Sequence, residues 1–194
     1  MIRCGYAHRI IDAAVDLSTQ LTADTASVCA LDISVPDYYL DLLVYDTPET
    51  AAQAMFSAPY NVASALVKGR FDLDALTHAA LTHPEVTRLT RLASVTTRTP
   101  RDPALFYDPN DPDTVSVTLN DGRQLTSVAR HITGSIHQPL SVNALRKKFS
   151  DCLRQWDGHG EHDSLWSMLL AVEELQNLGP LLEALALPAR PTSS

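Results

Sequence analysis

The sequence predicts an α+β protein in which an antiparallel sheet with flanking helices is followed by further helices. Apolar residues recur at helical spacing near the start of the chain, alternate with polar residues in several later segments, and return to helical spacing after residue 141. Because the expected strands and helices are not interleaved one by one along the chain, the helices should be segregated from an antiparallel sheet.

The first part of the chain is expected to contain a helix, two strands and a second helix. Helical spacing extends over His8–Leu21, and alternation over 27–34 predicts a strand. The run YYLDLLVY at 38–45 is β-like. The segment 47–69 then predicts a helix that Thr47 caps, with proline in its first turn and glycine at its end.

Pro59 and Tyr60 interrupt that last helix. A proline inside a helix removes a hydrogen bond and costs about 3 kcal/mol, whereas it is tolerated in a first turn. We therefore expect two helical pieces with Tyr60 at the bend. A tyrosine at a bend can direct its hydroxyl into a cavity as a hydrogen-bond donor or acid. The alternative is that Tyr60 packs with its hydroxyl at the surface.

The most specific signal in the second part is Asp121-Gly122, which stands between two alternating runs and predicts a β-hairpin. Before it we expect two short helices, a strand and a Pro- and Asp-rich loop, at 71–76, 83–93, 94–99 and 101–113. After it we expect three helices, at 141–156, 162–178 and 180–187. The predicted domains are an α+β domain at 1–140, C-terminal helices at 141–188 and a disordered tail at 189–194.

The composition argues against several classes of protein. The chain has 194 residues, 45% apolar and 20% charged, as is typical of a globular protein. It contains no apolar run of roughly 18 residues, so no membrane span or membrane partner is expected. A net charge of −8 does not attract nucleic acid. Three cysteines without CxxC spacing, and a start unlike a signal peptide, predict free thiols and a cytoplasmic location.

The clearest candidate for chemistry is at the start of the chain. Cys4, His8 and Asp12 are spaced by four, so on a helix they share one face. A carboxylate that hydrogen-bonds to His8 would fix its tautomer and suit it to acid–base work. The alternative, a helix start with ordinary polar residues, stays open. No metal is expected, because the remaining histidines, such as His159 and His162, lack further ligands at suitable spacing.

Taken in order, five segments resemble the MmgE/PrpD family. They are CGYAHRIIDAA (4–14), TPETAAQAMFSAPYNVASALVKG (47–69), HPEVTRLTRLASV (83–95), TVSVTLNDGRQL (114–125) and GSIHQPLSVNALRKKF (134–149). The known members of this family include 2-methylcitrate dehydratase, cis-aconitate decarboxylase and iminodisuccinate epimerase. Family members consist of an N-terminal helical domain, an α+β lid domain, and C-terminal helices that return to pack on the helical domain. The chain resembles only the lid and the returning helices.

The resemblance also implies a site between lid and helical domain. By the motifs quoted above, His8 and Tyr60 stand at the family's catalytic positions, and Cys4, Ser57 and His137 would contact the substrate. His8 would serve as the acid–base group, and Tyr60 would donate to a developing oxyanion or a leaving hydroxyl. The lysine that family members carry shortly before the cysteine has no counterpart here.

The implied activity is that of a cofactor-free lyase or isomerase, acting on a small carboxylate by dehydration, decarboxylation or epimerisation. A separate helical MmgE/PrpD N-terminal-domain protein, or a homo-oligomer, would complete the site. Two alternatives remain: a non-catalytic binding or scaffolding subunit derived from the lid, and a repurposed stand-alone biosynthetic enzyme. The apolar helices after residue 141 need more covering than a small sheet can give, and so favour a partner in either case.

Overall fold

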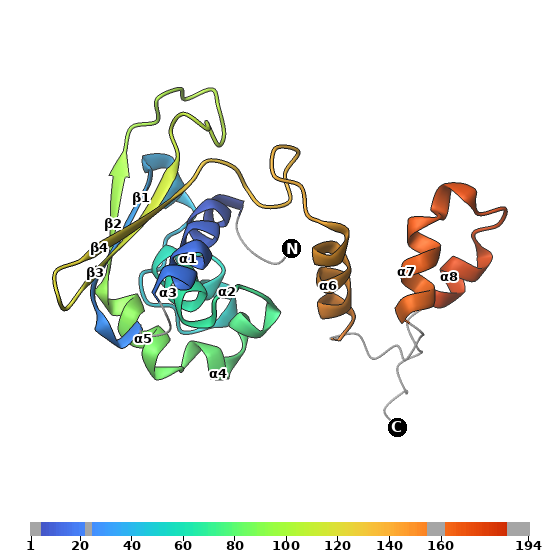
Figure 1. Ribbon diagram of the computed structural model, residues 1–194, viewed down its shortest axis with the longest axis horizontal. Coiled ribbons are helices and arrows are strands. Elements are labelled where there is room, and N and C mark those ends of the chain that lie inside the picture. Colours follow the sequence, from blue (N-terminus) through green and yellow to red (C-terminus); the bar gives the residue numbers. More distant parts are fainter. Residues whose placement is uncertain (1–4, 22–24, 155–161, 186–194) are drawn as a thin grey trace. The chain divides into compact units, whose positions relative to one another are not determined.

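The computed structural model describes residues 5–21, 25–154 and 162–185, and it confirms the α+β class. The chain divides into two compact units, Met1–Pro139 (unit 1) and Leu140–Ser194 (unit 2). Unit 1 contains the sheet and the helices that cover it, and unit 2 contains helices only (Figure 1). The expected tail at 189–194 lies outside the described residues.

Unit 1 is built on a four-stranded mixed sheet with the strand order β2-β1-β3-β4. The strands are β1 (Val28–Pro36), β2 (Ala93–Arg98), β3 (Asp113–Leu119) and β4 (Gln124–Ala129). In the register, Ile33 of β1 lies opposite Val95 of β2 in a parallel pair and opposite Val115 of β3 in an antiparallel pair. The expected antiparallel pairing therefore holds for β1–β3 and β3–β4. The pair β1–β2 is parallel, since the chain crosses over between these strands through several helices.

The β3–β4 hairpin forms at the predicted dipeptide. Gly122 has φ 85°, a left-handed conformation that glycine adopts without steric cost, and its N–H donates to the carbonyl of Leu119 at 2.9 Å. The carboxylate of Asp121 accepts the backbone N–H of Arg123 at 3.0 Å, which closes the turn from the other side.

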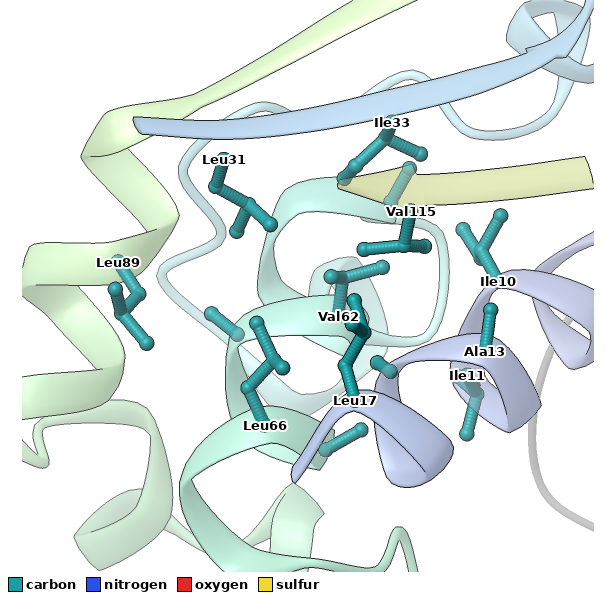
Figure 2. Close-up of a cluster of buried hydrophobic side chains, with 14 of the residues drawn as sticks. Ile10, Ile11, Ala13, Leu17, Leu31, Ile33, Val62, Leu66, Leu89 and Val115 are labelled. Carbon is teal, nitrogen blue, oxygen red and sulfur yellow. The ribbon is translucent and has the colours of Figure 1, made fainter. Parts of the chain in front are cut away.

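Helices cover one face of the sheet, as Figure 1 shows. They include α1 (His8–Gln20), α3 (Ala58–Lys68) and α5 (Pro84–Leu92). Leu31, Ile33 and Val115 of the sheet point toward Leu17 of α1 and Val62 of α3, and all five are fully buried (Figure 2). Each such side chain contributes roughly 1.5–3 kcal/mol on burial. The opposite face is lined by Ser and Thr of β3, which fits the alternating pattern of that strand.

The interrupted segment 47–69 forms two helices, as predicted. The first, α2 (Ala51–Ala54), is capped by Thr50 and not by Thr47 as expected. The second, α3, is capped by Ser57, whose Oγ accepts the N–H of Tyr60 at 3.2 Å. Pro59 therefore occupies the first turn of α3, where its missing N–H is not needed.

Two other predictions differ from the structure, and one helical turn was not predicted. The β-like run 38–45 is not a strand: η3 (Asp37–Asp41), a 3-10 helix, occupies its first half. Both edges of β1 are already paired, so no edge of that strand is open to this neighbouring segment. The short helix expected at 71–76 is also a 3-10 helix, η4 (Leu73–Leu76), and it is followed by a single helical turn, α4 (His78–Leu81), that was not predicted.

Unit 2 comprises α6 (Val142–Leu153), α7 (His162–Leu170), the 3-10 helix η5 (Val172–Glu174) and α8 (Gly179–Leu185). Ser141 caps α6, and the rings of Phe149 and Trp166 join α6 to α7 with centroids 5.3 Å apart. The helix expected at 162–178 ends earlier, at Leu170. In neither unit is a described helix long and apolar enough to cross a membrane.

Candidate active site

The N-terminal end of α1 carries the strongest of the predicted site residues. His8 is the first residue of α1, directly after the 3-10 turn η1 (Gly5–Ala7), and it is 8% exposed. Asp12 lies one turn further along the same helix, and its Oδ2 accepts the backbone N–H of Thr133 at 2.7 Å. Cys4, the third member of the predicted face, lies outside the described residues.

His137 is carried by a loop that is attached to the first two turns of α1. This loop follows β4 and is held at Thr133 by Asp12 and at the carbonyl of Arg130 by Arg9, whose Nη2 donates at 2.7 Å. The exposed ring of His137 packs against the ring of His131, with centroids 4.9 Å apart. The structure thus connects His137 to the helix that begins with His8.

Arg9 is the residue that sequence reasoning missed. Its side chain is 1% exposed, and its guanidinium donates through Nη2 to the carbonyls of Asp108 and Arg130, both at 2.7 Å. Nη1 donates to the carbonyl of Asp111 at 3.2 Å and lies 3.8 Å from Oδ1 of Asp113. A planar guanidinium is suited to such a set of divergent acceptors.

Asp113, at the start of β3, is fully buried beneath two arginines. Its Oδ1 accepts from Nη2 of Arg98 at 3.2 Å, in addition to its contact with Arg9. Burial raises the pKa of Asp113 to about 6, although both guanidinium groups act in the opposite direction. Arg98 also binds Asp111, with Nε 2.5 Å from Oδ1. The two buried or half-buried cations of this region are therefore already paired with carboxylates.

An aromatic cluster surrounds this network. The ring of Tyr6 stacks on Tyr39 at a centroid distance of 4.8 Å and on Phe106 at 6.0 Å, and Tyr38 and Tyr107 complete the group. Phe106 is 64% exposed. The sequence signal for this cluster was the pairing of adjacent aromatic residues at 38–39 and 106–107 in segments expected to be a strand and a loop.

Tyr60 and Ser57 lie at the start of α3, which packs against α1. Tyr60 is 2% exposed, and its hydroxyl donates to the carbonyl of Ala75 in η4. Burial raises the pKa of Tyr60. Ser57 is fully buried as the cap of the helix. The structure thus brings Ser57 and Tyr60 together and directs the tyrosine hydroxyl toward η4.

No metal centre is evident in the ranges that the structure describes: none of their His, Cys, Asp and Glu side chains form a group of three or more that could hold an ion. Cys29 and Cys152 are exposed free thiols.

Unit 1 is thus a helix-covered mixed sheet with a nearly buried histidine at the start of its first helix, next to a buried arginine–aspartate network. This defines the class of the chain as an α+β domain with a candidate acid–base site. The family model of the MmgE/PrpD C-terminal domain matches residues 3–173, which covers unit 1 and extends through α7 of unit 2. The chain belongs to the MmgE/PrpD family and corresponds to its C-terminal half. No curated protein matches it.

Proposed function

We propose that the chain forms part of an MmgE/PrpD-type lyase or isomerase that dehydrates, decarboxylates or epimerises a small carboxylate by acid–base catalysis without a cofactor. The observation that carries this proposal is the family match, together with the histidine of the CGYAHRIIDAA segment, His8, at the start of α1. A helical domain, on another chain or in a homo-oligomer, would supply the other wall of the site.

In this proposal His8 moves the proton. Imidazole is the side chain best suited to accept and return a proton near neutral pH. The low exposure of His8 limits its contact with water, so a bound substrate would meet a largely desolvated group.

The proposed role of Tyr60 depends on a movement of η4. Because its hydroxyl already donates to Ala75, it can donate to a substrate only if η4 moves away. We therefore propose that closure of the site displaces η4 and releases the Tyr60 hydroxyl, and that Ser57 holds the turn in which Tyr60 lies. His137, exposed on its loop, is proposed to contact the substrate, as is Cys4.

The charges of unit 1 bear on where the substrate carboxylates would be bound. Arg9 and Arg98, which flank the candidate site, are already bonded to carbonyls and to Asp111 and Asp113. The whole chain has a net charge of −8. We therefore propose that the cations that bind the substrate carboxylates come from the helical domain.

The test is turnover by the assembly purified from the cells that make it. Small di- and tricarboxylates are incubated with it in deuterated water, and NMR follows loss of water, loss of carbon dioxide and exchange of carbon-bound protons. We expect one of these reactions, and we expect His8→Asn to abolish it. His78→Asn, at an exposed histidine in α4, is the matched control. Turnover that survives His8→Asn would refute the assignment of His8.

A second candidate function is a non-catalytic binding or scaffolding subunit. It is favoured by the exposed apolar side chains of unit 2, among them Val142, Leu170 and Leu182. The native mass of the assembly and the peptides that travel with it separate the candidates. A helical partner without turnover supports the scaffold, whereas turnover by a lone chain supports a repurposed stand-alone enzyme.

A further inference from the structure

The turn that carries His8 is held at both of its ends by the β2–β3 loop (residues 99–112). Before His8, the Tyr107 hydroxyl lies so close to Gly5 that a Cβ added there would be 3.0 Å from the hydroxyl oxygen. After His8, the guanidinium of Arg9 donates to the loop carbonyls of Asp108 and Asp111. The same loop therefore contacts the chain three residues before the imidazole and one residue after it.

Tyr107 connects these two contacts. The Cζ of Arg9 lies 5.4 Å from the centroid of the Tyr107 ring, a cation–π geometry, while the hydroxyl of that ring faces Gly5. Tyr107 has φ 63°, and among the described residues it is the one non-glycine residue with positive φ. A bulky residue rarely adopts this conformation unless its surroundings hold it there. The contacts with Arg9 and Gly5, together with the rings of Tyr6 and Tyr39, are part of these surroundings.

The far end of the loop is fixed to the sheet. Arg98, the last residue of β2, binds the carboxylate of Asp111 and donates to the carbonyl of Pro112 at 2.7 Å. It also shares the buried carboxylate of Asp113 with Arg9. A continuous set of bonds thus runs from two strands of the sheet, through the loop, to the residue that follows His8.

We propose that Arg9 is a positioning residue that fixes the orientation of the His8 imidazole through the β2–β3 loop. Its two Nη atoms bind carbonyls from two separate segments, the β2–β3 loop and Arg130 after β4. A lysine keeps the charge but has a single nitrogen and cannot bind these divergent acceptors together. The expected effect of Arg9 on catalysis rests on the proposed function. Its expected effect on the orientation of the His8 ring does not.

The experiment compares the wild-type chain with Arg9→Lys. Long-range ¹H–¹⁵N correlation spectra report the tautomer and ring environment of each histidine, and urea unfolding reports stability. We expect the His8 signals to shift or to show a mixture of tautomers in Arg9→Lys, while those of His78 stay unchanged. Arg123→Lys, in the exposed β3–β4 turn, is the matched control and should leave both histidines unchanged.

A purely structural role would give a different result. If Arg9→Lys unfolds at lower urea but keeps the wild-type His8 signals, the proposal is overturned. If Arg9→Lys does not fold, Tyr107→Gly decides, because glycine accepts the backbone conformation and removes only the ring. Unchanged His8 signals in folded Tyr107→Gly would then overturn the proposal, and shifted signals would support it.

The experiments also distinguish failure of the proposed function from failure of the positioning role of Arg9. If His8→Asn leaves turnover intact, the function assigned to His8 fails, but an effect of Arg9→Lys on the His8 signals still stands. If His8 is required for turnover, misplacing it should act on the chemical step. We then expect Arg9→Lys to lower kcat by about tenfold or more with little change in KM. A change confined to KM would speak against positioning.

Discussion

The carboxylate of Asp12 accepts the backbone N–H of Thr133 at 2.7 Å, which joins α1 to a segment 121 residues later in the chain. This bond holds the loop of His131 and His137 beside the helix that His8 begins. We expect Asp12→Ala to release the loop and to lower the free energy of unfolding by about 1.5–3 kcal/mol, the range for a hydrogen bond to a charged group. Urea unfolding and hydrogen exchange at the Thr133 amide measure the two effects. Asp32→Ala, at an exposed carboxylate of β1, is the control, and a Thr133 amide that exchanges at the wild-type rate would contradict the prediction.

Asp113 should give the protein a recognisable pH dependence. Its pKa is raised from 3.8 to about 6, so between these values the folded state holds a proton that the unfolded state has lost. The stability that Asp113 contributes is therefore present below pH 4 and is lost as the pH rises through 6, by an amount on the order of 2 to 3 kcal/mol. Asp113→Asn removes this contribution.

The measurement is the free energy of unfolding of both proteins between pH 4 and pH 7. We expect the free energy of unfolding of Asp113→Asn, minus that of wild type, to increase from pH 4 to pH 7. The size of this difference at pH 4 does not affect the test. The exposed-site variant Asp32→Asn should run parallel to wild type. A constant difference between Asp113→Asn and wild type would mean that Asp113 does not titrate there.

Replacing Tyr60 by phenylalanine tests how η4 is held. The change removes the hydroxyl and leaves the carbonyl of Ala75 without this donor inside a buried region. We expect a loss of about 1–2 kcal/mol in the free energy of unfolding and faster hydrogen exchange in η4. Tyr45→Phe, at an exposed tyrosine, is the control. Unchanged exchange in η4 would show that other contacts hold this segment.

The close approach of Tyr107 to Gly5 can be tested by a double-mutant cycle. Gly5→Ala introduces a Cβ 3.0 Å from the hydroxyl oxygen and should lower the free energy of unfolding by about 1 kcal/mol. In a Tyr107→Phe background the oxygen is gone, so the same change should cost less. Urea unfolding of the four proteins gives the coupling, expected at about 0.5 kcal/mol or more. Equal costs in both backgrounds would exclude the contact.

Local signals in the sequence predicted much of the fold. Asp121-Gly122 predicted the hairpin, and Pro59 predicted the division of the 47–69 helix, because each acts through its own backbone conformation. The run 38–45 was predicted wrongly, since whether a β-like segment pairs depends on which strand edges are free. Nothing local indicated that β2 would run parallel to β1.

The candidate site was less predictable, because its contacts also depend on residues that are distant in the sequence. His8 and Tyr60 could be named because they stand in motifs. Arg9 could not, because its acceptors at 108, 111 and 130 are about a hundred residues away, and a lone arginine in a helix is ordinarily exposed. Likewise, no pattern around Tyr60 pointed to the carbonyl of Ala75.

The pairing of β1 has a consequence for how the chain acquires its structure. Both neighbours of this central strand, β2 and β3, come late in unit 1, and only β3 and β4 are joined by a short turn. Long chain segments must therefore close before β1 gains any pairing, which makes folding slower than in a helical bundle of the same size. During synthesis β1 leaves the ribosome first, and both of its edges stay unpaired until β2 follows and one of them until β3 follows. The early-made half of unit 1 is thus the part most in need of protection from association with other chains.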